Sequence, residues 1–276
     1  MNINRASLFQ VFKYAVYCLL ALNIFFFGRE EYLAALLQFP GGVPPGQLIE
    51  AYASTIDTAA WVVLLLMFEL ETYLLEDRHF TPAVKRTLHG VRIFCYTFIV
   101  YAFYGYVVNV FFVYDTALLG GITDLCAVSA DGWSYAIDLD EYVAITAANC
   151  TSFSDATAYW HLTRLPALVD YPGLIDIQRL AWTDVINAGV WILIVIILEV
   201  DVRLQEKGRF DGLALRLSTA FKVVSYSILF LAAVYWGIKG DFVDFWDAFL
   251  WLLAFFFIEL NVVEWRHEDL EAGKTA

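Results

Sequence analysis

Long apolar runs separated by short charged segments form the pattern of this sequence. A helix that crosses a bilayer needs roughly 20 mostly apolar residues, each adding about 1.5 Å of length. Six windows meet that requirement: 10–28, 55–75, 91–114, 181–202, 218–238 and 243–263. The first window lacks a small-residue cleavage site and runs straight into Arg29, Glu30 and Glu31, so we interpret it as a span and not as a signal peptide.

Three of the six predicted helices carry one polar motif at one spacing. An acid or amide is followed four residues later by Trp, eight residues after that by Glu, and two residues after that by another acid or amide. The copies are Asp57, Trp61, Glu69 and Glu71; Asn187, Trp191, Glu199 and Asp201; and Asp247, Trp251, Glu259 and Asn261. The preceding helix of each copy carries a base and then a tyrosine four residues on: Lys13 and Tyr17, Arg92 and Tyr96, and Lys222 and Tyr226.

This repetition predicts an all-α integral membrane protein. Its six transmembrane helices would form three two-helix repeats in a pseudo-threefold bundle, because repeats place equivalent positions around one axis. The predicted repeats are 1–87, 88–216 and 217–276, and the second contains a small extracytoplasmic domain at 115–180.

Helical geometry limits where the acids of the motif can point. At 100° per residue, Glu69 and Glu71 point about 200° apart, so one of them faces the centre and the other faces a neighbouring helix. An unpaired charge in the bilayer costs at least ~2.5 kcal/mol. We therefore expect ion pairs at the level of the bases, such as Lys13 with Glu71 and Arg92 with Asp201.

The predicted layer holds more acid than base. It contains the acids Glu69, Glu71, Glu199, Asp201 and Glu259 and the bases Lys13, Arg92 and Lys222. The two extra negative charges require protonated glutamates, a bound cation, or access to water. In the alternative reading, the charges only lock helices together and the long side chains snorkel to the interface.

These residues make up the candidate site. Glu69, Glu199 and Glu259 would form an ion- or proton-binding ring, together with Glu71, Asp201 and Asn261. Lys13, Arg92 and Lys222 would be counter-charges, and Tyr17, Tyr96 and Tyr226 would donate supporting hydrogen bonds. We expect Asp57, Asn187 and Asp247 in the first turn of their helices, where an acid suits the helix dipole; the alternative is an outer polar ring that guards a pathway. The tryptophans would be packing or interfacial aromatics.

Composition agrees with a membrane location. The chain of 276 residues is 61% hydrophobic, and its mean hydropathy of +0.63 exceeds what a soluble domain of this size would carry. With a cytoplasmic N-terminus, 13 of the 17 basic residues lie on the inner side, and only Arg29, Arg164, Arg179 and Lys239 lie outside. This bias predicts a bacterial-type inner membrane with both termini cytoplasmic.

Charge and cysteines describe the region outside the membrane. Residues 115–180 contain nine acids against Arg164 and Arg179, a net charge of −7. This charge serves solubility, or it attracts cations towards an entrance. It argues against a nucleic-acid partner. Cys126 and Cys150 lie in this region, where disulfides persist, so we expect a bond between them; Cys18 and Cys95 lie in helices and would be packing residues.

No catalytic motif of the common enzyme families occurs in the sequence, so we expect neither catalytic residues nor a cofactor. The leading hypothesis is a membrane protein that conducts or transports a cation or proton through the glutamate ring. The alternative is a non-transporting accessory or assembly subunit of a larger membrane complex. Besides the lipid bilayer, a protein partner or a second copy of the chain is compatible with both.

Overall fold

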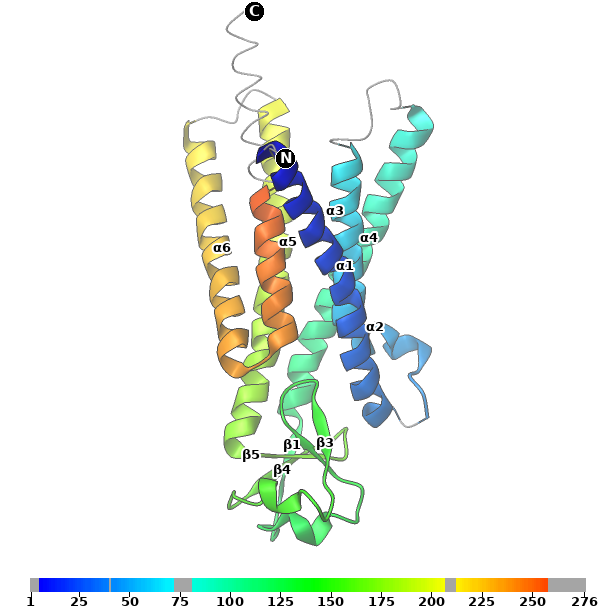
Figure 1. The fold of residues 1–276 in the computed structure, drawn as a ribbon, viewed down its shortest axis with the longest axis vertical. Coiled ribbons are helices and arrows are strands. Elements are labelled where there is room, and N and C mark those ends of the chain that lie inside the picture. The colour runs from blue at the N-terminus through cyan, green and yellow to red at the C-terminus, as the bar shows by residue number, and fades with distance from the viewer. Residues whose placement is uncertain (1–4, 40, 72–80, 207–211, 258–276) are drawn as a thin grey trace, which may run out of the picture. The chain divides into compact units, whose positions relative to one another are not determined.

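The computed structural model describes residues 5–39, 41–71, 81–206 and 212–257. These residues form seven α-helices and one five-stranded sheet. The helices are α1 (Arg5–Gln38), α2 (Leu48–Ala51), α3 (Ala53–Glu69), α4 (Pro82–Tyr114), α5 (Tyr171–Glu206), α6 (Gly212–Lys239) and a last helix at 242–257 (Figure 1). The chain divides into two compact units. The first contains residues 1–23 and 190–276, and the second contains residues 24–189.

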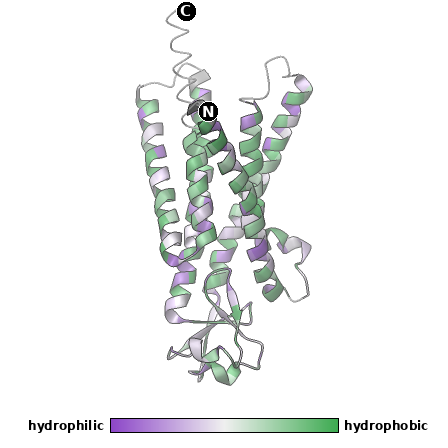
Figure 2. Ribbon diagram, in the orientation of Figure 1, coloured by the Kyte–Doolittle hydropathy of each residue, from purple (hydrophilic) through white to green (hydrophobic). Residues whose placement is uncertain are grey.

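Several helices are long and apolar enough to cross a membrane. Four qualify singly, at Leu8–Gln38, Pro82–Tyr114, Tyr171–Asp201 and Gly212–Lys239. The segment Pro45–Ala51 and α3 qualify together as a fifth, bent by 75°. Colouring by hydropathy shows mostly apolar residues along the helices and a more polar sheet region (Figure 2). The expectation of a mostly helical chain with several helices long and apolar enough to cross a membrane is therefore confirmed.

The finer prediction, six helices in three equivalent repeats, is wrong. The first returning helix is broken into α2 and α3, and a five-stranded sheet follows α4. The last helix has only residues 242–257 described, and the rest of its predicted span, 258–263, lies outside the described residues. The prediction failed because apolar windows show where a chain can span but do not reveal a break inside a run or a sheet between two runs.

A buried carboxylate stabilises the break between α2 and α3. Glu31 on α1 is 7% exposed, and its two oxygens accept hydrogen bonds from Ser54 N at 2.7 Å, Thr55 N at 3.1 Å and Thr55 Oγ1 at 2.5 Å. These backbone N–H groups belong to the first turn of α3, where a helix has no internal acceptors. Glu31 therefore acts as the N-terminal cap of α3 from another helix, a role normally taken by a residue next to the helix start.

Close contact between small residues lets α3 pack along α4 within the second unit (Figure 1). A Cβ atom added to Gly105 on α4 would lie 3.2 Å from the Cβ of Ala53 and 3.4 Å from the carbonyl oxygen of Ile49. Any larger side chain at position 105 would push the helices apart. Small residues allow such close packing between membrane helices.

The sheet lies between α4 and α5 in the sequence. Its strands β1 (Thr116–Leu119), β2 (Ser134–Ala136), β3 (Tyr142–Ala144), β4 (Tyr159–Leu162) and β5 (Ala167–Asp170) follow the order β1-β4-β5-β2-β3. All neighbours are antiparallel except β2 and β5, which are parallel. The buried core of this domain includes Leu125, Ile145, Tyr159 and Leu168.

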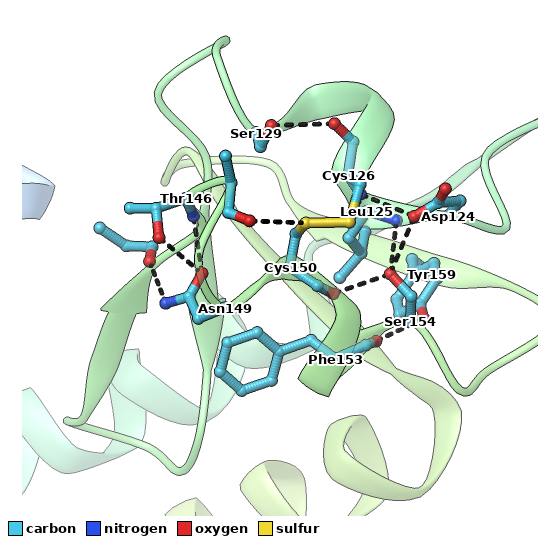
Figure 3. Close-up of a disulfide and its surroundings, with 12 residues drawn as sticks. Asp124, Leu125, Cys126, Ser129, Thr146, Asn149, Cys150, Phe153, Ser154 and Tyr159 are labelled. Atoms are coloured by element: carbon cyan, nitrogen blue, oxygen red, sulfur yellow. Dashed lines mark hydrogen bonds between the residues drawn. A yellow bond between two sulfur atoms is a disulfide. The ribbon is translucent and has the colours of Figure 1, made fainter.

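The predicted disulfide between Cys126 and Cys150 is confirmed. It joins two short 3-10 helices, Leu125–Val128 and Cys150–Phe153 (Figure 3). Ser154 supports the same junction, since its hydroxyl accepts a hydrogen bond from Leu125 N and donates one to the carbonyl oxygen of Cys150, both at 2.8 Å. The disulfide therefore cross-links the loops that cover the core of the sheet domain.

Helix α5 begins earlier than the sequence pattern predicted. We expected a helix start near residue 182, but α5 starts at Tyr171. Asp170 Oδ1 accepts a hydrogen bond from Gly173 N at 2.8 Å, which caps the new start. Thr183 lies inside the helix and donates its hydroxyl hydrogen to the carbonyl oxygen of Arg179 at 2.8 Å.

Aromatic packing characterises the first unit. The ring of Trp191 on α5 lies 4.5 Å from that of Phe255 and 6.4 Å from that of Trp251, both on the helix at 242–257. Phe257 on the same helix makes an edge contact with Phe9 of α1 at 5.2 Å. Trp191 and Trp251 are buried, in agreement with a packing role.

Candidate functional site

Two of the predicted acids form ion pairs with bases on the next helix. In the second unit, Glu71 pairs with Arg92 of α4. In the first unit, Asp201 Oδ2 lies 3.2 Å from Lys222 Nζ of α6 and accepts a 2.5 Å hydrogen bond from Ser218 Oγ. The base follows the acid by 21 residues in both pairs. The first two copies of the motif therefore share an acid–base ion pair as well as the same sequence spacing.

This pairing differs from the one we expected. The sequence predicts pairs of Lys13 with Glu71 and of Arg92 with Asp201. In the structure, Glu71 pairs with Arg92, and Asp201 pairs with Lys222. The reason is connectivity. A short connection brings the end of one helix beside the start of the next, so the acid meets the base that follows it in the chain.

The three ring glutamates have different surroundings. Glu69 is buried on α3, with 5% exposure. The side chain of Glu199 is 57% exposed, and its Oε1 lies 2.9 Å from Arg203 Nη2 one turn along α5. Glu259 and Asn261 lie outside the described residues. The ring remains a prediction, but Arg203 supplies a base for Glu199 that our count of acids and bases had omitted.

The predicted counter-charges and tyrosines are also distributed unevenly. Lys13 is 3% exposed, and its Nζ lies 5.2 Å from the ring centroid of Tyr14 and 6.0 Å from that of Tyr17. These distances suit cation–π attraction. Tyr17 is buried, whereas Tyr96 is exposed to 38%. The three tyrosines therefore do not share one environment, although the sequence treats them alike.

The first residue of each motif copy makes a polar contact or is buried without one. Asp247 Oδ1 accepts a hydrogen bond from Asn23 Nδ2 of α1 at 2.8 Å, and the side chain of Trp251 also hydrogen-bonds Asp247. Asp57 Oδ2 accepts a hydrogen bond from the hydroxyl of Tyr106 on α4 at 3.5 Å. The amide oxygen of Asn187 is buried and has no hydrogen-bond partner among the described residues.

These positions do not lie in first turns, as we had expected. Asp57 lies one turn into α3, which begins at Ala53. Asn187 lies well inside α5, which begins at Tyr171. The expectation failed because the helices start earlier than the apolar windows predict. Asp57 and Asn187 are therefore too far from the helix N-termini for the helix dipole to explain them. The alternative, an outer polar ring that guards a pathway, stays a prediction.

A cavity of about 640 Å³, counting its open mouth, lies in the second unit. Parts of α1, α2, α3, α4 and α5 line it together with loops of the sheet domain. The polar residues of its lining are Glu31, Gln38, Glu50, Ser54, Tyr106, Asn109, Asp140, Tyr142 and Asp184. Four of these are carboxylic acids and none is a base, so the cavity is a region of negative potential.

Tyr142 closes part of the cavity wall on the sheet side. Its hydroxyl donates a hydrogen bond to the carbonyl oxygen of Leu139 at 2.8 Å. Burial raises the pKa of the Tyr142 phenol well above its usual value, and the neighbouring charges of Asp140 and Asp138 raise it further. The phenol therefore stays neutral at physiological pH and acts as a hydrogen-bond donor in the wall.

Sequence reasoning missed most of this cavity. In the sequence, Glu31 is only a charged flank of the first apolar window, and Glu50, Asn109 and Asp184 lie outside the repeated motif. A signal existed for two of the lining residues. Tyr106 and Asn109 are polar positions three residues apart in an apolar run, which places them on one face of α4. The acids could not be found this way, because they come from segments far apart in the chain.

Among the described residues, no group of three or more His, Cys, Asp or Glu side chains is arranged to hold a metal ion. Comparison with known proteins adds no relative: no family model, curated protein or solved structure matches the chain.

Proposed function

We propose that this protein conducts or transports a small cation or a proton across a membrane, and that the acidic cavity of the second unit is one mouth of the pathway. The observation that carries the proposal is the cavity lining, which contains four carboxylic acids and no base. Clefts of one charge sign with low-dielectric walls raise the local concentration of the opposite charge. A cavity of this kind concentrates cations at the ends of the spanning helices.

A polar contact leads from the cavity into the helices. Tyr106 lines the cavity, and its hydroxyl donates to Asp57, the first residue of the motif on α3. Further along α3 lies the buried Glu69, the last residue of that helix. Acids inside membrane spans are expensive and commonly mark ion or proton routes. In this proposal, Asp57 and Glu69 continue the route that begins at the cavity.

The ion pairs have a different role in this scheme. Glu71 with Arg92 and Asp201 with Lys222 are already compensated, so they hold neighbouring helices together and do not exchange ions. Lys13, Arg92 and Lys222 remain fixed positive charges. The positive-inside bias supports cytoplasmic termini, which puts the cavity and the sheet domain on the outer side of what we propose is a bacterial-type inner membrane.

Flux through liposomes tests the proposal. The purified protein would be reconstituted into liposomes. A membrane potential, negative inside, would drive Na⁺, K⁺ or H⁺ inwards, and a fluorescent indicator inside the liposomes would report the uptake. We expect flux above that of protein-free liposomes, reduced several-fold in the double variant Glu50→Gln with Asp184→Asn. The matched control is Asp131→Asn, an exposed acid of the sheet domain that does not line the cavity. Equal flux in the double variant and the wild type would exclude the cavity as the mouth.

A second function, that of a non-transporting accessory or assembly subunit, is supported by the paired charges. If all inner acids serve only to join helices, the membrane region is a scaffold and the sheet domain is the part that contacts a partner. A partner that co-purifies in fixed stoichiometry, combined with no flux from the isolated chain, would favour this function over transport.

A further inference from the structure

Asn23 is a fully buried amide in the middle of α1. It is 0% exposed, and it lies within the candidate span Leu8–Gln38. Its Nδ2 donates a hydrogen bond to Asp247 Oδ1 at 2.8 Å. Its Oδ1 is buried and has no hydrogen-bond partner among the described residues. A buried acceptor without a donor has lost its hydrogen bonds to water and has not replaced them within the protein. This costs free energy, so the arrangement needs an explanation.

A proton on Asp247 provides that explanation. An ionised carboxylate only accepts hydrogen bonds, so it cannot serve the free oxygen of Asn23. A carboxylic acid beside an amide can accept from the amide N–H with one oxygen and donate its own O–H to the amide oxygen. The neutral form therefore provides a donor for the oxygen of Asn23, whereas the ionised form provides none.

Asp247 needs the proton whichever end of the Asn23 amide is the nitrogen. If the oxygen and nitrogen of Asn23 were exchanged, two acceptor oxygens would face one another at 2.8 Å. That contact also requires a hydrogen between them, and Asp247 is the only one of the two that can gain it. Both orientations therefore lead to the same protonation state.

The surroundings of Asp247 offer no compensating charge. Its recorded interactions are with Asn23 on α1 and Trp251 on its own helix, and no charged side chain of the described residues is among them. The charged groups nearest in the chain are Lys239 at the end of α6, Asp241 in the turn, and Asp244 at the start of the last helix. Lys239 lies 5.9 Å from the ring centroid of Tyr235, and Asp241 Oδ1 accepts a hydrogen bond from Asp244 N at 3.4 Å.

We infer that Asn23 and Asp247 form a buried proton-binding site in which Asp247 is a neutral carboxylic acid at neutral pH. The proton binds to a carboxylate oxygen from water and returns to water, and no other bond is made or broken. The inferred protonation of Asp247 does not require that the protein transports ions. Its use as a relay, with the proton as the transported ion, rests on the proposed function.

Infrared spectroscopy of the full-length protein in phosphatidylcholine vesicles tests the inference. A protonated carboxyl group has a C=O stretching band separate from carboxylate and amide bands, and the band shifts in D₂O. Exposed Asp and Glu ionise near pH 4, so a band that persists at pH 7 reports a buried acid. We expect such a band in the wild type and its loss in Asp247→Asn, which keeps the size of the side chain.

Two further variants keep the test decisive. In Asn23→Leu the amide partner is gone, so the band should remain but move in frequency, even if Asp247→Asn fails to fold. In Glu31→Gln the Asp247 band should be unchanged, because that buried acid belongs to the cap of α3. A wild type without any band at pH 7, a band unchanged in Asp247→Asn, or one unmoved in Asn23→Leu would overturn the inference. Liposome flux is a separate measurement, so the site can be confirmed while transport is disproved.

Discussion

At the scale of single residues, the ion pair of Asp201 and Lys222 differs from that of Glu199 and Arg203 in exposure. The side chains of Lys222 and Asp201 are 18% and 10% exposed, whereas those of Arg203 and Glu199 are 69% and 57% exposed. Water and ions screen an exposed pair, so its net contribution to stability is small. Removing one partner of a buried pair leaves a charge without compensation.

We therefore predict that Lys222→Met destabilises the protein by about 3–5 kcal/mol. Arg203→Met, the matched change in the exposed pair, should cost about 0–1 kcal/mol. Adding Asp201→Asn to Lys222→Met should recover part of the loss, because no unpaired charge then remains. Thermal unfolding in detergent measures all four proteins, and equal losses for Lys222→Met and Arg203→Met would contradict the account.

At the same scale, the phenol of Tyr135 in the sheet domain gives a pH dependence. Burial raises the pKa of Tyr135 to about 12, with a further contribution from the charge of Asp170. An exposed tyrosine ionises at about pH 10. Between these values the unfolded chain releases this proton and the folded domain keeps it, so the stability of the domain falls as the pH rises from about 10 to about 12.

Absorbance of tyrosinate during a pH titration measures this effect. The wild type should show buried phenols that ionise later than the exposed tyrosines, and Tyr135→Phe should remove the one that ionises near pH 12. The same substitution should also weaken the loss of stability above about pH 10. A titration identical in the wild type and the variant would show that Tyr135 ionises as an exposed tyrosine does.

At the scale of elements, the break between α2 and α3 depends on Glu31. Loss of an N-terminal cap costs about 0.5–2 kcal/mol of helix stability, so Glu31→Ala should fray the start of α3. Hydrogen exchange of the Ser54 and Thr55 amides measures this, since both donate to Glu31. The control is Thr81→Ala, which removes the Thr81 cap of α4 and should speed exchange at Val84 alone. Unchanged protection of both amides in Glu31→Ala would exclude the cap.

The disulfide is a second device at this scale. It closes a loop with a separation of 24 residues, and the loss of a cross-link of this size costs about 3 kcal/mol on the chain-entropy estimate. Replacing both Cys126 and Cys150 with Ser should make the sheet domain sensitive to protease at lower temperature. Replacing Cys18 and Cys95, which are free, should leave the domain as resistant as the wild type, and sensitivity in both double variants would contradict the assignment.

How far the sequence predicts the elements depends on the kind of signal. Apolar runs locate α1, α4, α5 and α6, because a run of 20 residues is a strong local signal. The disulfide follows from compartment and position. The break before α3 and the pairing of Asp201 with Lys222 were missed, since they depend on which segments meet in space. Glu31 is an example, because its role is set by Ser54 and Thr55, which lie more than 20 residues away.

At the scale of the whole molecule, the account separates two sets of acids. The paired set, Glu71 and Asp201, would fasten helices. The second set would meet the cation or proton; it contains the cavity acids, Asp57 and Glu69 of the proposed route, and Asp247 of the inferred proton site. Acids of both sets occur in the repeated motif. The spacing of the motif therefore does not show which acids bind a cation and which join helices. Glu71 and Asp201 are set apart by their ion pairs with Arg92 and Lys222, because a carboxylate held by a base is already compensated.

One measurement tests this division most directly, namely voltage-driven proton or cation flux in liposomes compared between the two sets. The account predicts that Asp247→Asn lowers flux several-fold while the protein stays folded. The paired double variant, Asp201→Asn with Lys222→Met, should keep flux near the wild-type rate per folded protein. The reverse result, with flux lost in the paired variant and kept in Asp247→Asn, would contradict the account.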